Sequence, residues 1–316
     1  ALTLSSPRRD LTDALVVGGY RLGSLVSKFV PGRLAGPTSS VVGLPASLAM
    51  GDQRRMVERH LRRVLPNASA SQRRRLALEV FDYYSRYYLE SFRLPIVTAS
   101  EIKRGFSIEG FDEHLLPALQ AGKGAIVSLP HLGGWEWAGR WMTDQGYRMT
   151  VVVEPLQPVE LFEWFVDLRK GFGLTVVPLG PDAGAQILRA LSANEVVCLL
   201  SDRFIDGAST PVEFFGERTL LPAGPATLAI RTGAPILPTA VYFRGRGNGH
   251  HAVIRPPVPI QRLGRLREDV QRVTQALARE LELLIRRAPE QWHLLQPNWP
   301  SDPGWSHGEV PEPTSH

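Results

Sequence analysis

Residues 124–139 read GAIVSLPHLGGWEWAG, in which a short, largely apolar run is followed by a histidine, two glycines and a helix-like segment. The run is partly β-branched and is bounded by glycine and proline, which is typical of a strand buried on both faces. A strand that leads directly into a helix is half of the strand–helix–strand unit of α/β proteins. This stretch therefore predicts one such unit.

The same alternation repeats along the rest of the chain. Further strand-like runs are RMTVVVEP, LTVVPLG, EVVCLLSD and PILPTAVYF, and the helix-like pieces between the runs cover residues 135–145, 158–172, 182–193 and 224–232. Alternation of this kind predicts an α/β fold with a central, mostly parallel sheet and helices on both faces.

The flanking segments have a different texture. Residues 52–93 and about 268–287 have helical patterns, and Asn67 or Ser69 is a suitable cap for a helix that follows. Residues 31–51 are rich in Gly, Pro and Ser and predict a connection. We therefore expect a basic N-terminal helix and connection (1–51), an α/β domain (52–300) and a flexible tail (301–316).

Positive charge gathers near the N-terminus, where residues 1–75 hold thirteen Lys or Arg and four Asp or Glu. Residues 11–30 place apolar side chains at three- and four-residue spacing among basic ones. This pattern predicts an amphipathic helix on an anionic membrane surface, or alternatively a helix packed on the domain with solvated arginines. No apolar run is long enough to span a bilayer, and no signal-peptide layout is visible. The basic runs lack a recognition motif, so we expect no nucleic-acid partner.

Several kinds of chemistry have no signature here. Cys198 is the only cysteine and lies in an apolar run, so we expect a buried thiol, no disulfide and no zinc site. The chain has no GxSxG elbow, HExxH helix, phosphate-binding loop or GxGxxG after the first strand. We therefore expect neither a metal nor a bound cofactor.

Polar residues follow three of the predicted strands. His131, Glu154 and the run Ser201–Asp202–Arg203 stand where ligands bind in open α/β sheets. Glu136 follows His131 by five positions, and Gly133–Gly134 could turn the chain so that its carboxylate faces the imidazole. Such a pair leaves one ring nitrogen free as a base, and without a nucleophile it suits deprotonation of a substrate hydroxyl. A turn histidine satisfied by backbone is the alternative.

Four blocks carry a family resemblance: SLPHLGGWEWAG, LLSDRFID, VEFFGERTLLPAGPATLAIRTGAPILP and QWHLLQPNW. In their order and spacing the chain resembles the lipid A biosynthesis branch of the lysophospholipid-acyltransferase-like superfamily. Within it the chain looks most like actinobacterial phosphatidylinositol mannoside acyltransferases. The resemblance implies transfer of a long acyl chain, such as palmitoyl, from acyl-CoA to a sugar hydroxyl of a glycolipid, at the cytoplasmic face of the plasma membrane.

The resemblance also implies roles for individual residues. His131 would be the base, Glu136 would orient it, and Asp202–Arg203 match the family's acid–arginine pair near the active centre. Candidates for binding the oxyanion or phosphates, or the substrate more generally, are Arg203, Glu154, Arg218 and the backbone of Ala223 and Gly224.

The mannoside enzymes carry Asp in place of Glu136 and Glu in place of Asp202, which keeps both charges and so the expected chemistry. The segment after Glu154, PLQPVELFEWF, is less basic than in those relatives, which leaves the acceptor open. A lysophospholipid or lipid A-like acceptor, a thioesterase, or a silent lipid-binding relative are the alternatives. His293 belongs to the resemblance, but we expect it to pack rather than to act in catalysis. His250 and His251 are expected in a surface turn that leads into a strand.

Overall fold

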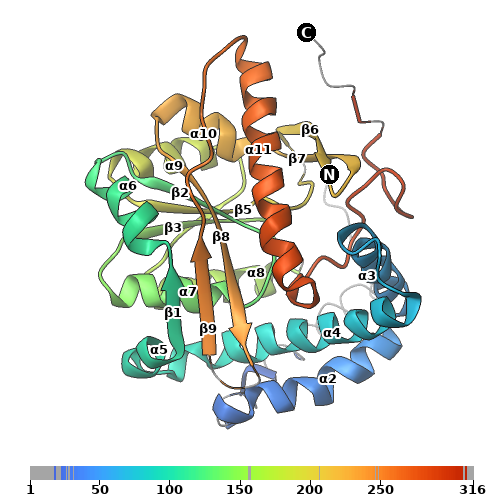
Figure 1. Ribbon diagram of the computed structural model, residues 1–316. Helices are drawn as coiled ribbons and strands as arrows, with labels where there is room; N and C mark the ends of the chain where they lie inside the picture. Colours follow the sequence, from blue (N-terminus) through green and yellow to red (C-terminus); the bar gives the residue numbers. More distant parts are fainter. Residues whose placement is uncertain are drawn as a thin grey trace, which may run out of the picture.

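The computed structural model describes residues 18, 23–25, 27, 29, 30, 32–155, 158–205, 207–245, 247, 249–308, 310 and 311. Its centre is a seven-stranded sheet with the order β1-β9-β8-β2-β5-β3-β4 (Figure 1). The strands are β1 (Phe106–Glu109), β2 (Ala125–Leu129), β3 (Met149–Val153), β4 (Thr175–Pro178), β5 (Val196–Leu200), β8 (Ile236–Arg244) and β9 (Gly249–Ile254). All neighbours are parallel except β8 and β9. The predicted α/β class with a mostly parallel sheet is confirmed.

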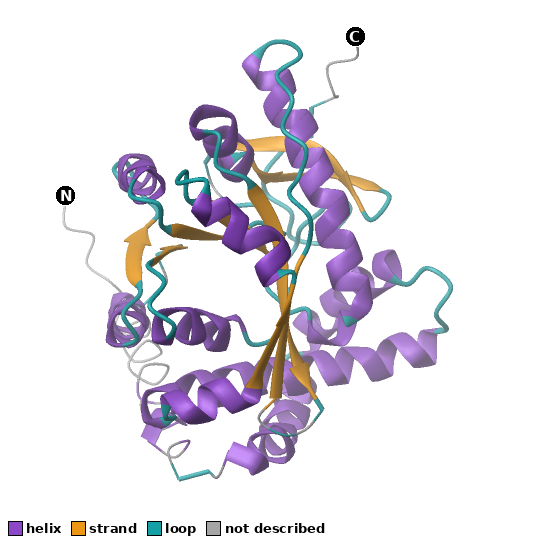
Figure 2. Cartoon of the chain, turned by 60° about the vertical axis from the view of Figure 1, so that its left-hand side comes forward, coloured by secondary structure: helices purple, strands orange, loops and turns teal. Residues whose placement is uncertain are grey.

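Helices cover both faces of this sheet (Figure 2). They are α2 (Ala35–Ala49), α3 (Gly51–Val64), α4 (Ala70–Arg93), α5 (Ala99–Gly105), α6 (Leu116–Gln120), α7 (Trp135–Asp144), α8 (Val159–Gly171), α9 (Ala183–Ser192), α10 (Gly224–Thr232) and α11 (Leu266–Arg287). Short turns of other helix types are η1 (Gly32–Leu34), η2 (Leu94–Ile96), η3 (Phe111–Leu115) and η4 (Pro289–Gln291).

The core is divided by the sheet because successive strand residues point to opposite faces. Ile126 packs with α9, α10 and α11, whereas its neighbour Val127 packs with α5 and α7. Cys198 is buried in the second cluster, as its apolar run predicts. Burial on both faces explains why these strands are nearly continuous apolar runs.

The predicted connection over residues 31–51 is wrong, because residues 35–49 form helix α2 beside α4 (Figure 1). A Cβ added at Gly43 would lie 2.7 Å from the Cα of Asp82. The Ser39 hydroxyl donates to the Asp82 carboxylate at 2.7 Å. The small residues that suggest a connection therefore allow close helix packing. Most of residues 11–30, and the amphipathic helix predicted there, lie outside the described residues.

The predicted tail boundary at residue 300 also needs correction. The carboxylate of Asp302 is buried and accepts from the backbone N–H groups of Asn298 (3.0 Å) and Trp299 (3.1 Å). It also pairs with Arg63 of α3 at 2.8 Å. The folded body therefore continues past residue 300.

One hairpin is not among the strands that the sequence pattern predicts. Strands β6 (Ser209–Phe214) and β7 (Glu217–Pro222) pair antiparallel and pack on α11. Their connecting residues Phe215 and Gly216 have φ values of 52° and 76°. Two positive φ angles match the twist of a two-residue hairpin, but an aromatic residue is unusual there.

Candidate active site

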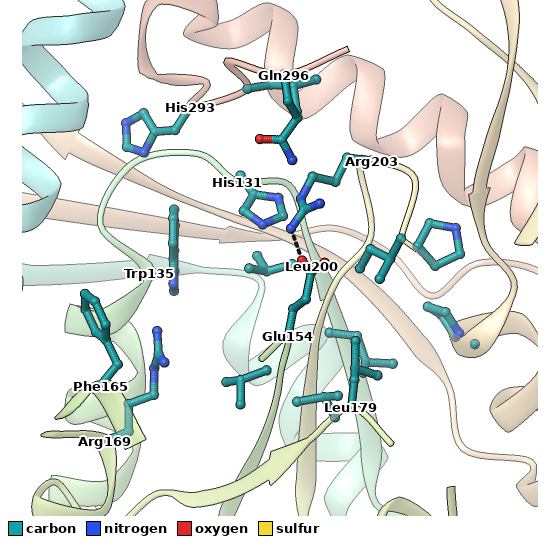
Figure 3. Close-up of a pocket in the computed structure, with 18 of the residues that line it drawn as sticks. His131, Trp135, Glu154, Phe165, Arg169, Leu179, Leu200, Arg203, His293 and Gln296 are labelled. Carbon is teal, nitrogen blue, oxygen red and sulfur yellow. Dashed lines mark hydrogen bonds and ion pairs between the residues drawn. The ribbon is translucent and has the colours of Figure 1, made fainter. Parts of the chain in front are cut away.

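A cavity of about 460 Å³ opens beyond the carboxyl ends of β2, β3 and β5 (Figure 3). This volume is in the range of small-molecule sites. Its ionisable or polar wall is formed by His131, Glu154, Arg169, Arg203, His293 and Gln296. Its apolar wall includes Val152, Leu179, Ile187, Leu199, Leu200 and Leu228. The cavity therefore joins a polar end to an apolar recess.

The predicted base stands at the polar end. Nδ1 of His131 lies 2.6 Å from Oδ1 of Asp202, and the backbone N–H of His131 donates to Oδ2 at 3.0 Å. The indole N–H of Trp292 donates to the same Oδ2 at 2.7 Å. With Nδ1 carrying its proton toward Asp202, Nε2 is the nitrogen that can accept a proton.

The sheet itself brings the two side chains together. Leu129 of β2 is in register with Leu200 of β5, and His131 and Asp202 each follow by two residues. Burial alone would raise the pKa of the Asp202 carboxyl. The imidazole of His131 and the hydrogen bonds from His131 and Trp292 instead hold that pKa below its usual range. Asp202 is thus an anion at neutral pH.

The predicted contact between Glu136 and His131 is not formed. Glu136 lies in the first turn of α7, buried, and accepts from Arg169 of α8 at 2.5 Å and from the Tyr87 hydroxyl at 3.0 Å. Its side chain therefore turns toward α4 and α8, because a buried carboxylate is stabilised there by a cation and a second donor. The carboxylate that contacts the imidazole is instead that of Asp202, which follows the adjacent strand β5.

The cavity contains a second ion pair. Arg203 pairs with Glu154, which follows β3 (Figure 3). The amide oxygen of Gln296, in the orientation that satisfies its hydrogen bonds, accepts from Arg203 Nη1 at 2.9 Å. Arg203 is consequently held against the cavity wall with its charge close to His131.

The other predicted anion-binding groups separate. Gly224, the first residue of α10, lines the cavity. Ala223 does not, and its N–H already donates to the carbonyl of Ala208 at 3.0 Å. Arg218 is in β7, where its guanidinium contacts the carbonyl of Pro311 outside the cavity. Of this set, the fold places Arg203, Glu154 and Gly224 at the site.

Aromatic residues complete the walls. Tyr84, Tyr87 and Tyr88 of α4 and Trp135 of α7 line the cavity. Their helical spacing on α4 is the signal that indicates an aromatic face in the sequence, although spacing alone does not show which side it covers.

His293 lines the cavity as well, rather than packing away from it. Neither of its ring nitrogens has a hydrogen-bond partner in the part of the chain that the structure describes. Burial, followed by the charge of His131, lowers the pKa of His293 to about 3. The ring is therefore neutral and can offer one donor and one acceptor to a ligand.

The strand predicted after His250 and His251 is present, but it already includes both residues, so His250 is not in a surface turn. It lies in β9, is buried, and its Nε2 is 2.8 Å from Oε2 of Glu90. Its ring stacks on Trp137 with a centroid distance of 4.4 Å. It faces the interior because strand residues alternate, and His251 takes the outer position.

The sequence has known relatives. Residues 7–301 match a family described as bacterial lipid A biosynthesis acyltransferase. The chain is 38% identical over 251 residues to a phosphatidylinositol mannoside acyltransferase of Mycobacterium tuberculosis, covering 78% of this chain and 77% of the relative. The enzyme of that description from Mycolicibacterium smegmatis is 38% identical over 222 residues, 69% and 70% of the two chains. A lipid A biosynthesis acyltransferase of Haemophilus influenzae is 23% identical over 272 residues, covering 85% and 82%.

None of the helices in the described ranges combines the length and the apolar character that a membrane span requires.

Proposed function

The chain belongs to the bacterial lipid A biosynthesis acyltransferase family, and we propose that it transfers a long acyl chain from acyl-CoA to a sugar hydroxyl of a phosphatidylinositol mannoside. The observation that carries the proposal is the His131–Asp202 pair at the polar end of a cavity that also has an apolar wall. The identity of 38% to mannoside acyltransferases supports the choice of acceptor.

The chemistry requires a base and no nucleophile from the protein. His131 Nε2 takes the proton of the acceptor hydroxyl while the hydroxyl oxygen attacks the thioester carbonyl carbon. The tetrahedral oxyanion collapses, the carbon–sulfur bond breaks, and the leaving thiolate of CoA takes the proton back from the imidazolium. A thioester is activated enough that no acyl-enzyme is needed.

Charge develops on the carbonyl oxygen during this step. Preorganised donors that face the oxyanion supply a large part of the stabilisation in acyl transfer. Arg203 and the backbone of Gly224 are our candidates because both line the cavity. Asp202 balances the imidazolium, and Glu136 acts through Arg169 as part of the wall rather than on His131 itself.

The apolar and the polar walls of the cavity suit the acyl chain and the acceptor sugar, respectively. Leu179, Ile187, Leu199 and Leu228 offer an apolar surface to the acyl chain, where each buried methylene contributes about 0.8 kcal/mol. Glu154 and His293 offer hydrogen-bonding groups to an acceptor sugar on the polar wall.

We further propose that the enzyme works as a peripheral protein on the anionic cytoplasmic face of the plasma membrane. Helix α2 contains no charged residue, and Val41, Leu44 and Leu48 on it are 73%, 50% and 66% exposed. On the adjoining α3, Arg55, Arg59 and Arg62 are exposed on one face. Apolar side chains beside cations are the combination that binds an anionic lipid surface.

The test is palmitoyl transfer from palmitoyl-CoA to a panel of acceptors: phosphatidylinositol mannosides, a lysophospholipid and a lipid A-like precursor. We expect the mannosides to be acylated best and His131→Ala to abolish transfer while its thermal unfolding is unchanged. Preference for another acceptor would contradict the proposal that a phosphatidylinositol mannoside is the acceptor. Hydrolysis alone would identify a thioesterase, and neither transfer nor hydrolysis would identify a lipid-binding relative.

A further inference from the structure

Asp202 is held by a segment that lies 90 or more positions further along the chain. Trp292 lies 90 positions after Asp202, and its indole N–H donates to Oδ2 at 2.7 Å. Asn298 donates through Nδ2 to the backbone carbonyl of Asp202 at 3.1 Å and accepts from the N–H of Phe204 at 2.9 Å. Both the side chain and the backbone of Asp202 are therefore fixed from outside the sheet.

The same segment contacts the other member of the pair. The backbone N–H of His293 donates to the carbonyl of His131 at 2.7 Å. Leu132 also forms an isolated bridge with Trp292. Residues 292 to 298 thus contact His131 and Asp202 through both backbone and side chains.

The segment is anchored in turn on α3. Asp302 accepts from the backbone of Asn298 and Trp299, and it pairs with Arg63 at 2.8 Å. His60 lies behind Trp292 with a ring-centroid distance of 5.7 Å, and its Nδ1 is 3.1 Å from the carbonyl of Leu294. Asp202, Asn298, Trp292 and His60 are all buried, so these contacts are shielded from bulk solvent.

We propose that Trp292 is a positioning residue for acyl transfer, whose indole N–H fixes the orientation and the charge of the Asp202 carboxylate behind His131. This inference rests on the proposed function, in which His131 is the base.

The physical reason is the number of donors on Oδ2. The carboxylate meets the imidazole through Oδ1 and two N–H groups through Oδ2, so it cannot rotate without breaking three bonds. Without the indole N–H, the carboxylate is freer and its negative charge is less neutralised, so it holds the imidazolium more strongly. The other ionisable groups of the cavity are His293, Arg203, Glu154, Arg169, Tyr84, Tyr87 and Tyr88, and His60 with Asp302 lies behind Trp292. A Trp292 variant leaves these groups in place.

Trp292→Phe removes the donor and keeps an aromatic ring. Trp299→Phe is the matched control, since Trp299 is equally buried in the same segment and its indole N–H donates to the carbonyl of Phe214 at 3.1 Å, away from the pair. Both variants lose one buried hydrogen bond and similar apolar area. A merely structural role would make them alike.

The measurement is kcat and KM for palmitoyl transfer as a function of pH in the wild type, both variants and His131→Ala. We expect Trp292→Phe to lower kcat roughly tenfold with little change in KM, and to move the acidic limb of kcat/KM upward by roughly half a pH unit or more. Trp299→Phe should keep the wild-type profile. If the two variants give the same kcat and the same profile, the inference is overturned.

The outcomes separate this inference from the proposed function. If His131→Ala keeps its activity, His131 is not the base and the proposed function fails. If His131→Ala loses activity while Trp292→Phe keeps the wild-type pH profile, only the proposed role of Trp292 fails. If Trp292→Phe fails to fold, the indole N–H signals of the seven tryptophans in wild-type protein serve instead. One of them should lie far downfield and shift in Asp202→Asn, and the absence of such a signal would overturn the inference.

Discussion

Nδ1 of His131 lies 2.6 Å from Oδ1 of Asp202, and the two residues stand in register beyond neighbouring parallel strands. Sheet register therefore brings base and carboxylate to the same edge of the sheet, and contacts from Trp292 and Asn298 hold the carboxylate in place there. A pair fixed in this way is ready before substrate binds, which reduces the reorganisation needed during proton transfer.

Asp202→Asn tests the pair directly. The asparagine amide would donate to Nδ1 and so favour the tautomer in which Nε2 carries the proton, leaving no base toward the cavity. We expect kcat to fall by roughly two to four orders of magnitude with little change in KM, measured as palmitoyl transfer under steady state. A variant that folds normally and keeps activity within a few fold of the wild type would show that this pair is not the base.

Glu136→Gln should act on stability more than on chemistry. The substitution leaves the Arg169 guanidinium in a mostly buried position without its anion, because the Glu136 and Arg169 side chains are only 5% and 15% exposed. Removing one partner of such a pair costs about 3 kcal/mol or more, measured as the free energy of unfolding in urea. The double variant Glu136→Gln/Arg169→Gln should recover much of this loss. Unchanged stability together with an Asp202→Asn-like loss of kcat would instead assign Glu136 to the reaction.

The sequence predicts the strands and helices well where burial imposes a regular spacing of apolar residues. It predicts the site less well, because the site depends on which strands pair and in which register. The strand runs and the cap at Ser69 are confirmed, the latter as a capping box with Gln72. The sequence predicts both His131 and Asp202 at strand ends, but its prediction of Glu136 as the carboxylate that contacts the imidazole is wrong. Distance along the chain favours Glu136, whereas strand register, which the sequence does not state, brings Asp202 to the imidazole.

Other errors share a cause. Gly43 and Ser39 indicate a connection in isolation, yet they permit close packing of α2 on α4. His250 shows no sign of burial until β9 joins the sheet and places Glu90 beside it. In each case the local sequence is compatible with two structures, and tertiary contacts determine which one forms.

His293 should make folding sensitive to acid. The pKa of its imidazole is lowered to about 3 by burial, whereas the unfolded chain has the ordinary value near 6.5. Below that ordinary value the unfolded state binds a proton that the folded state does not, so this contribution to stability is present above pH 6.5 and is lost as pH falls toward 3. Between pH 6.5 and 5 the loss amounts to about 2 kcal/mol.

The measurement for His293 is urea unfolding of the wild type and His293→Phe at a series of pH values. The variant should lose less stability on acidification, by about 2 kcal/mol at pH 5. Its KM for the acceptor should rise because the ring no longer offers a donor and an acceptor. Parallel curves of stability against pH would contradict the buried neutral imidazole, and an unchanged KM would contradict its contact with the acceptor.

Membrane binding should depend on the exposed apolar side of α2. Val41→Ser/Leu48→Ser removes two side chains that are 73% and 66% exposed, so stability should change little, while binding to vesicles should weaken roughly tenfold or more. The matched control is Leu263→Ser/Leu266→Ser, which alters side chains 70% and 50% exposed near the start of α11, far from α2 in Figure 1.

The measurement is co-sedimentation with vesicles of phosphatidylglycerol and of phosphatidylcholine, together with transfer to detergent-dispersed acceptor. Anionic vesicles should bind more wild-type protein because Arg55, Arg59 and Arg62 are exposed on α3, which directly follows α2. Activity in detergent should be equal in all variants. Equal loss in both double variants would show that any exposed leucine contributes, and a change in oligomeric state on altering α2 would mean that a second copy, not lipid, covers this face.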